Sequence, residues 1–250
     1  MLGTMKALIH KILWQLLPLE GYLRVVSRMF FVCQRLGIGR RAPAMEYVYH
    51  LSELVHEGDV CIDIGANLGY YARTISRLAG AAGRVHAVEP VAPIRKVLSR
   101  NLRRCGNVEI YPFALGTENK PICMGNDSVH TNGYLGTGQN FVNDARMESD
   151  VEFLADMRRG SELFGTLSRL DFVKCDIEGY ERIVMTEMQP LLQRFRPVVL
   201  IETGGENRPA IIALFRGMGY VGFTLDQGRE VLLDPVHDNG KDIIFRPQKG

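Results

Sequence analysis

An apolar segment that turns through two glycines into a helical pattern constrains the fold of this chain more than any other feature. Residues 60–64 read Val-Cys-Ile-Asp-Ile, and Gly65 and Gly69 follow them four positions apart. A helical pattern then begins near Tyr70. Glycine adopts backbone conformations that a Cβ atom would penalise, and it lets a ligand approach the main chain closely. The segment therefore predicts a buried strand, a tight turn and a helix.

Two acidic side chains close the first two predicted strands. Asp63 ends the first strand, and Glu89 follows the apolar residues 85–88. Open α/β sheets bind ligands at the carboxyl ends of their strands, and an acid after the second strand can accept hydrogen bonds from a ribose. A carboxylate before the glycine turn would repel a pyrophosphate, but it suits the cationic amino group and sulfonium of S-adenosyl-L-methionine. The alternative, a generic βαβ unit with a chance acid, is disfavoured because two acids occur at this spacing.

The distribution of charge separates the first forty residues from the rest. The 250 residues suit one large α/β domain or a domain with a small appendage, and 46% hydrophobic and 23% charged residues are typical of a soluble globular protein. The net charge of +2 argues against an extended nucleic-acid footprint. Residues 1–41 hold seven Lys and Arg against one Glu, a net +6, so the remainder carries −4.

Two helical patterns account for that basic segment. Apolar residues recur at helical spacing in residues 9–16 and 22–36, with Pro18 and Gly21 between them. We predict a basic amphipathic helical segment over residues 1–43 and the main domain over 44–250. The helices could lie on an anionic membrane or mediate self-association. The favoured alternative is a cap that packs on the domain with its basic face solvated. We expect no membrane span and no signal peptide.

The cysteines indicate a reducing compartment. There are five of them, an odd number, and their spacing is not that of a metal site. We expect free thiols, no metal, and a cytoplasmic protein, with peripheral contact at the inner membrane surface left open by the basic helices.

Strand and helix patterns alternate along the chain, as in a doubly wound parallel sheet. Further strands are predicted at residues 85–88, 108–111, 172–175, 198–201, 220–225, 230–233 and 242–245. Helices are predicted at residues 45–55, 70–78, 92–104, 181–193 and 209–218. The last two strands should be antiparallel because only short turns separate them. We therefore predict an α/β fold with a seven-stranded, mostly parallel sheet and an antiparallel end.

Residues 124–150 form the longest stretch without periodicity. They are rich in Gly, Asn, Asp and Ser, and an irregular loop of that length in a compact domain is usually functional or disordered. We expect a loop there and a helix over residues 151–157. Polar residues of the loop could hydrogen-bond a sugar, namely Thr131, Asn132, Tyr134, Gln139 and Asn140.

Three carboxylates crowd the turn after the strand at 172–175. They are Asp176, Glu178 and Glu181. Mutual repulsion and partial burial should raise the pKa of at least one of them, which favours proton transfer. Acids at a helix N-terminus also stabilise the helix dipole, and we favour that structural role for Glu181. For Asp176, at the end of a strand facing the cleft, we favour a functional role.

The two motifs together resemble the FkbM-type methyltransferases. The resemblance covers residues 58–202 and rests on residues 60–71, 88–90, 114–116, 172–181 and 197–202. The first motif alone indicates only a class I methyltransferase, but Lys-x-Asp-x-Glu-Gly-x-Glu at residues 174–181 is much more specific. The family commonly has alanine after the glycine of this motif, where this chain has Tyr180.

The resemblance implies a Rossmann-like, S-adenosyl-L-methionine-dependent O-methyltransferase with N-terminal helices added. Such enzymes methylate hydroxyls on sugars, glycolipids or related metabolites. The matching positions imply a cofactor site of Asp63, Gly65, Ala66, Asn67, Gly69, Tyr70, Glu89, Pro90, Phe113, Ala114 and Asp176. Asp176 is the first candidate for the general base, Glu178 the second and His130 a distant third.

Three other functions remain open at the level of sequence. A metal-dependent O-methyltransferase could hold Mg²⁺ between Asp176 and Glu202, which end adjacent strands. A binding or scaffold protein could keep the fold without catalysis. A nicotinamide-dependent oxidoreductase is the most remote of the three. The sequence does not identify the methyl acceptor.

Overall fold

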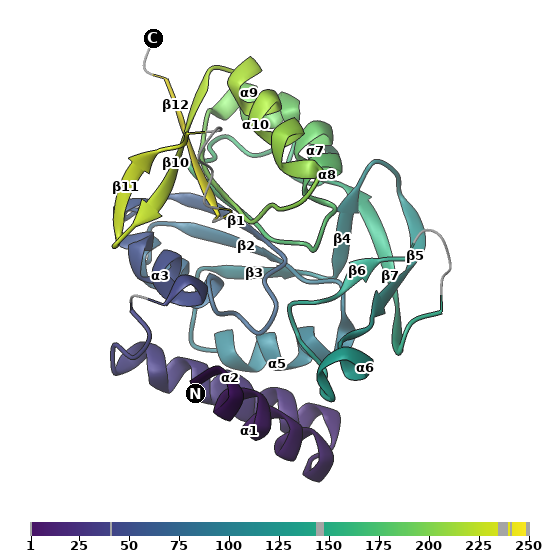
Figure 1. Ribbon diagram of the computed structural model, residues 1–250. Coiled ribbons are helices and arrows are strands. Elements are labelled where there is room, and N and C mark those ends of the chain that lie inside the picture. Colours follow the sequence, from purple (N-terminus) through teal and green to yellow (C-terminus); the bar gives the residue numbers. More distant parts are fainter. Residues whose placement is uncertain (1, 41, 144–147, 235–239, 241, 249–250) are drawn as a thin grey trace.

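An eight-stranded sheet forms the centre of the computed structural model, which describes residues 2–40, 42–143, 148–234, 240 and 242–248 (Figure 1). The strand order is β11-β10-β12-β9-β8-β1-β2-β3. The bounds are β1 Val60–Ile64, β2 Arg84–Val88, β3 Val108–Tyr111, β8 Phe172–Cys175, β9 Val198–Ile201, β10 Tyr220–Asp226, β11 Arg229–Leu232 and β12 Ile243–Pro247. The neighbouring strands β9, β8, β1, β2 and β3 pair in parallel. Strands β12, β10 and β11 continue the sheet beyond β9 and pair antiparallel. The predicted mostly parallel sheet with an antiparallel end is confirmed; it has eight strands rather than seven, and each of them, β11 included, overlaps a segment predicted as a strand.

Helices cover both faces of this sheet. On one face lie α3 (Pro43–His50), the short 3₁₀ helix η1 (Leu51–Glu53), α4 (Ala72–Ala79) and α5 (Ala92–Leu102), and on the other lie α7 (Gly160–Leu163), α8 (Glu181–Glu187), α9 (Gln189–Phe195) and α10 (Asn207–Gly217) (Figure 1). Strand residues alternate between the two faces, so Ile62 packs beneath α8 to α10 while Cys61 packs beneath α3 and α4. All five cysteines are free thiols, as expected.

The helix predicted over residues 181–193 is two helices. The chain leaves α8 at Met188, and α9 begins at Gln189 with Pro190 in its first turn. Proline lacks an amide hydrogen and its ring clashes with the preceding turn, so it begins a helix far better than it continues one.

A second sheet of four strands was not predicted from the sequence. Its order is β4-β7-β5-β6, with β4 Phe113–Gly116, β5 Lys120–Asn126, β6 Phe141–Val142 and β7 Val151–Arg159. The predicted helix over residues 151–157 is wrong, because these residues belong to β7. From Val151 to Met157 every second side chain of β7 is more buried than its neighbours, but Leu154 is apolar and 88% exposed, which hid the two-residue period. The predicted loop contains β6 and α6 (Ser128–Asn132), and residues 144–147 lie outside the described part.

The N-terminal helices α1 (Leu2–Leu16) and α2 (Leu19–Arg35) lie along α5 and the second sheet (Figure 1). Tyr22 and Leu23 of α2 are buried in one apolar cluster with Ile94 of α5. The Tyr22 hydroxyl donates a hydrogen bond to the carbonyl of Leu135, 2.9 Å away. The basic helices therefore contribute to the core through α2. No helix in the described residues is both long and apolar enough to cross a membrane.

Candidate active site

A pocket lies where β1, β2 and β8 end, between the main sheet and the second sheet. Parallel strands end at one edge of a sheet, so the residues that follow them meet there. Of the residues predicted from sequence, the pocket is lined by Gly65, Asn67, Glu89, Pro90, Phe113, Ala114, Asp176 and Glu178. The remaining predicted cofactor residues, Asp63, Ala66, Gly69 and Tyr70, lie outside this lining.

The first glycine of the turn makes room for protein rather than for a ligand. Gly65 has a φ of 78°, and a Cβ atom there would collide with the carbonyl oxygen of Asp176. Gly69 has a φ of 89°, and a Cβ atom would lie 3.0 Å from Cδ1 of Leu98. The turn after β1 is thus packed against the turn after β8, which fixes the floor of the pocket.

Asp63 is buried without any hydrogen-bonding partner. The side chain is fully buried, and neither carboxylate oxygen makes a hydrogen bond within the described residues. Desolvation raises the pKa of Asp63 to about 6, while the neighbouring Lys174 lowers it and Asp176 raises it. A buried carboxylate is costly without a compensating cation; the ammonium of Lys174 supplies part of that charge, and a further cationic group nearby would add to it.

Glu89 is placed to receive hydroxyl groups. Its Oε2 accepts a hydrogen bond from the amide of Asn67 and its Oε1 from the amide of Val91, each at 2.9 Å. These bonds fix the carboxylate at the pocket wall, and each oxygen keeps a second lone pair for a further donor. Desolvation raises the pKa of Glu89 to about 7.

The side chain of Asn67 adds a second unsatisfied group to this wall. Asn67 has a φ of 50°, and its Oδ1 is buried with no hydrogen-bond donor in the described residues. Ala66 beside it is buried, and its amide donates to the carbonyl of Val88 at 2.9 Å. Orphaned oxygens of Asp63 and Asn67 beside the fixed carboxylate of Glu89 fit a ligand with a cationic amino group and a ribose.

Asp176 is held by a lysine. Its Oδ2 lies 2.8 Å from Nζ of the buried Lys174, and that ammonium also lies 4.8 Å from the ring centroid of Tyr71. Lys174 is the register partner of Asp63 on the neighbouring strand, so one cation serves both carboxylates. The ion pair therefore engages one carboxylate oxygen of Asp176 with a cation of the protein itself.

Glu178 faces the pocket from the turn after Asp176. Its backbone has a φ of 52°, and its Oε1 approaches Gly138 of the opposite wall. Partial desolvation and the nearby carboxylates Asp176 and Glu181 together raise the pKa of Glu178 to about 7, although its side chain is still exposed to solvent. A carboxylate that titrates near neutrality beside a pocket is suited to accept a proton.

Glu181 has the structural role that we favoured. It is buried, and its carboxylate accepts hydrogen bonds from the amides of Ile177 and Gly179, each at 3.0 Å. These bonds hold the turn that carries Glu178.

Glu202 was a candidate metal ligand and His130 a candidate general base. Desolvation and the adjacent Asp176 raise the pKa of Glu202. Within the described residues, no group of three or more His, Cys, Asp and Glu side chains could hold a metal ion. His130 is exposed on α6 and is not among the residues that line the pocket.

Tyr70 packs against the N-terminal helices rather than lining the pocket. Its ring centroid is 4.1 Å from that of Phe30 of α2, so it connects the turn to the N-terminal helices. Tyr180, which departs from the commoner alanine, is partly buried and does line the pocket.

The second sheet supplies a wall that the sequence did not predict. Met124, Thr137, Gly138, Asn140 and Val142 line the pocket from this side. Asn140 was among the candidate polar residues, whereas Thr131, Asn132, Tyr134 and Gln139 do not line the pocket. The irregular polar composition of residues 124–150 and the glycines Gly136 and Gly138 were the sequence signals for this wall.

Comparison with protein families gives one match that covers most of the chain. A model described as the methyltransferase FkbM domain matches residues 63–221. This range includes every predicted site residue from Asp63 to Glu202. The resemblance inferred from the two motifs is therefore confirmed.

Similar proteins share shorter stretches or the fold alone. Protein-L-isoaspartate O-methyltransferases from Methanosarcina mazei and Methanocella arvoryzae are 33% identical over 73 residues and 34% identical over 82 residues. The matches cover 28% and 32% of this chain and 30% and 43% of those proteins, so the chain spans less than half of either relative. A crystal structure of methyltransferase FkbM from Methylobacillus flagellatus matches with a TM-score of 0.51 at 15% identity, over 77% of this chain and 44% of that chain. At this identity the likeness concerns the fold, which is that of a class I methyltransferase.

Proposed function

Because the chain belongs to the FkbM methyltransferase family, which depends on S-adenosyl-L-methionine, we propose that it methylates a hydroxyl oxygen on a sugar, glycolipid or related metabolite. The observation that carries this proposal is Glu178, a pocket-facing carboxylate whose pKa is raised to about 7. A hydroxyl is a poor nucleophile until its proton is accepted, and such a carboxylate can accept it at neutral pH.

The residues of the pocket fit the donor. Asn67 would contact its amino-acid part, with the negative charge of the buried Asp63 behind this part of the lining, and Glu89 would accept hydrogen bonds from its ribose hydroxyls. Phe113 and Ala114 line the wall where the adenine would lie. When bound there, S-adenosyl-L-methionine supplies a methyl group on a positively charged sulfur.

The protein's own groups divide the remaining work between orientation and proton transfer. Glu178 accepts the hydroxyl proton, since its carboxylate faces the pocket and is free of ion pairs in the described residues. Asp176, held by Lys174, orients the acceptor and keeps negative charge at the floor. From the sequence we ranked Asp176 before Glu178 as the general base. We now propose Glu178 first, because Asp176 is engaged in an ion pair with Lys174.

Several features support an oxygen acceptor with several polar groups. Thr137 and Asn140 on the wall opposite Glu178 offer hydrogen bonds to hydroxyl groups. The two curated relatives are named as O-methyltransferases of protein L-isoaspartate, which also places the transferred methyl on oxygen.

The test is a methyl-transfer screen with radiolabelled S-adenosyl-L-methionine over cell-envelope saccharides and glycolipids. We expect label in a base-stable ether of one acceptor class, no label with Asp63→Ala, and normal label with the exposed surface variant Asp226→Asn. Label on nitrogen, carbon or a protein carboxyl group would contradict the proposal. Loss of activity in EDTA would instead indicate a metal-dependent O-methyltransferase.

A further inference from the structure

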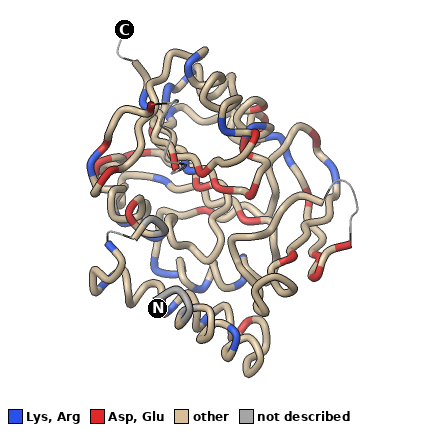
Figure 2. Tube along the Cα trace, viewed as in Figure 1, with Lys and Arg blue, Asp and Glu red and all other residues tan. Residues whose placement is uncertain are grey.

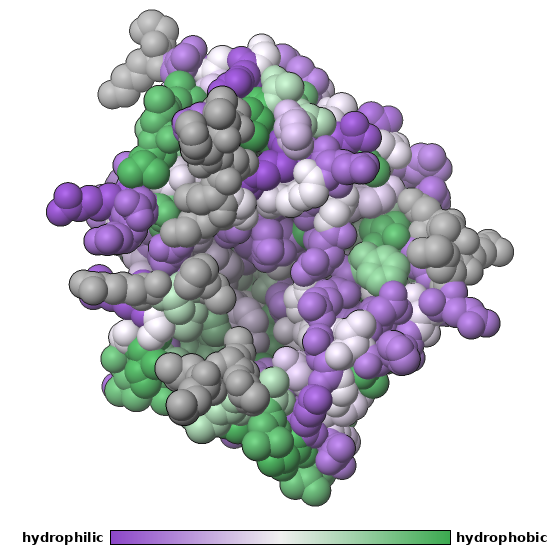
Figure 3. Space-filling model, in the orientation of Figure 1, coloured by the Kyte–Doolittle hydropathy of each residue, from purple (hydrophilic) through white to green (hydrophobic). Residues whose placement is uncertain are grey.

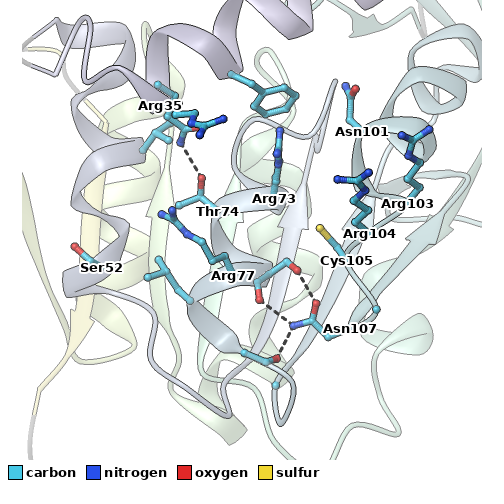
Figure 4. Close-up of a pocket in the computed structure, with 18 of the residues that line it drawn as sticks. Arg35, Ser52, Arg73, Thr74, Arg77, Asn101, Arg103, Arg104, Cys105 and Asn107 are labelled. Atoms are coloured by element: carbon cyan, nitrogen blue, oxygen red, sulfur yellow. Dashed lines mark hydrogen bonds between the residues drawn. The ribbon is translucent and has the colours of Figure 1, made fainter.

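A groove rich in arginine lies on the side of the molecule where α2 covers α4 and α5. We call it the arginine groove, and its lining includes Arg24, Arg28, Arg35, Arg40, Arg73, Arg77, Arg84, Arg100, Arg103 and Arg104. No Asp or Glu lines it within the described residues. Figure 4 shows Arg35, Arg73, Arg77, Arg103 and Arg104 extending from α2, α4 and the turn after α5 toward one shared space. The arginine groove shares no lining residue with the pocket described above.

Few of these arginines are neutralised by the protein. Arg100 lies 3.7 Å from Glu20, and Arg73 stacks over the ring of Phe31 at 4.6 Å. In the parts of the chain that the structure covers, Arg77, Arg103 and Arg104 make no ion pair. Like charges gathered without counter-charges repel each other, so the groove favours an anionic partner.

The floor of the groove is a fixed surface. Asn107 donates hydrogen bonds to the carbonyls of Ser76 and Gly80, at 3.0 Å and 2.7 Å, and it accepts one from the Ser76 hydroxyl at 2.6 Å. Gln34 of α2 donates to Thr74 of α4 at 2.8 Å, which joins the two walls. The arginines are therefore displayed on a rigid support (Figure 4).

Exposed aliphatic side chains are concentrated on the same N-terminal segment. Of the large hydrophobic residues that are exposed in the described part, those in this segment are Met5, Leu8, Ile9, Ile12, Leu16, Met29, Val32, Leu36 and Ile38, against Leu154, Val231 and Leu232 elsewhere. Val32 is 55% exposed and itself lines the arginine groove, and Leu36 beside it is 67% exposed. In Figure 3 apolar side chains gather along the lower part of the molecule, where α1 and α2 lie in Figure 1.

We infer that this face docks on an anionic membrane surface, with lipid phosphates in the arginine groove and the aliphatic side chains of α1 and α2 among the upper acyl chains. Helices with basic and aliphatic residues side by side bind membranes in this way. Nucleic acid would use the arginines but would leave the exposed aliphatic residues in water, so the membrane accounts for both observations.

The test is flotation of the full chain with vesicles of phosphatidylcholine, with and without phosphatidylglycerol. We expect binding only to the anionic vesicles and release by added salt. The triple variant Arg77→Gln, Arg103→Gln, Arg104→Gln should lower the partition coefficient by about 100-fold. Its matched control, Arg182→Gln, Arg216→Gln, Arg229→Gln, removes the same charge from exposed sites outside the groove and should bind as the parent chain does.

A second pair of variants tests the aliphatic contribution. Val32→Ser with Leu36→Ser should weaken binding by about tenfold. Leu154→Ser with Leu232→Ser, at exposed sites away from α1 and α2, should leave it unchanged. Equal donor affinity by calorimetry and equal thermal unfolding show that each variant folds.

Three outcomes would overturn the inference. One is equal binding to neutral and anionic vesicles, and another is equal loss in the groove triple and its control. The third is tighter binding to a polyuridylate RNA than to the anionic vesicles at equal phosphate, abolished by the groove triple. None of these readouts depends on the methyl acceptor.

Discussion

The pocket and the arginine groove carry opposite charge and are built in opposite ways. Carboxylates at the ends of neighbouring strands line the pocket, and most of the arginines that line the groove come from the helices and the turns next to them. Figure 2 shows acidic residues gathered near the strand ends and basic residues along the helices below. The strands are parallel and in register, so Asp63 and Lys174 meet directly and Glu89 and Asp176 follow close by. The groove instead joins helices far apart in sequence. A site at strand ends is thus specified by short contiguous motifs, and a site between helices is not.

The two regions also differ in how they use charge. Burial raises the pKa of Asp63 and Glu89, and partial desolvation with neighbouring carboxylates raises that of the exposed Glu178, so the pocket acts through a few perturbed carboxylates. The arginines on α4 and after α5 are exposed, so each contributes little and salt screens them. Changes in the pocket should therefore be large and specific, and changes in the groove gradual and additive.

The largest expected effect is that of Glu178→Gln. Loss of the proton acceptor should lower kcat by about 1000-fold while donor affinity changes little, because general bases contribute about 10² to 10⁴ in rate. Steady-state kinetics and calorimetry measure the two quantities. The control Glu152→Gln alters an exposed residue of β7 and should be neutral. Full activity in Glu178→Gln would show that Glu178 is not the general base and would favour Asp176.

Asp63→Asn should raise the Kd for S-adenosyl-L-methionine by about 100-fold, because a charge-assisted interaction with the amino group is lost. The folded carboxyl has its pKa raised above the ordinary value, so its ionised form destabilises the free protein as pH rises from about 4 through about 6. The amide removes that cost, and unfolding at neutral pH should require roughly 3 kcal/mol more. Calorimetry and urea unfolding test both signs. Weaker binding with lower stability would show a merely structural role.

The pH dependence of kcat should follow Glu178. With saturating donor, kcat should rise about tenfold per pH unit below pH 7 and level off above it, since the deprotonated carboxylate is the active form. The residual rate of Glu178→Gln should lack this slope. A slope that persists in the variant would assign it to another group. The groove triple variant should keep the parent profile.

The smallest expected effect is that of salt on the affinity of the pocket for S-adenosyl-L-methionine. Raising ionic strength to about 0.5 M should weaken binding to anionic vesicles by tenfold or more, because exposed arginines are screened. The donor Kd should change less than about twofold, since Asp63 and Glu89 are buried. Parallel flotation and calorimetry in one buffer series compare the two. Equal salt dependence would contradict the contrast between the regions.

Local patterns predicted the main sheet but not the second one. Most strands of the main sheet are rich in apolar residues and are followed by a turn, so their positions follow from local sequence. In β7 an exposed Leu154 replaced the polar residue that alternation requires, and the strand was mistaken for a helix. Of the wall residues Thr137, Gly138 and Asn140, only Asn140 was among the loop residues named from the sequence.

The sequence by itself determined the methyltransferase fold, the family and the carboxylates of the pocket, because these lie in contiguous segments whose strands must end at one edge. Only the tertiary structure decided that Lys174 forms an ion pair with Asp176 while Glu178 faces the cleft, and that Gly65 leaves room for the turn after β8. It also decided that arginines from α2, α4 and the turn after α5 converge in one groove. Such contacts depend on the directions in which separate elements pack, and short-range sequence patterns do not contain those directions.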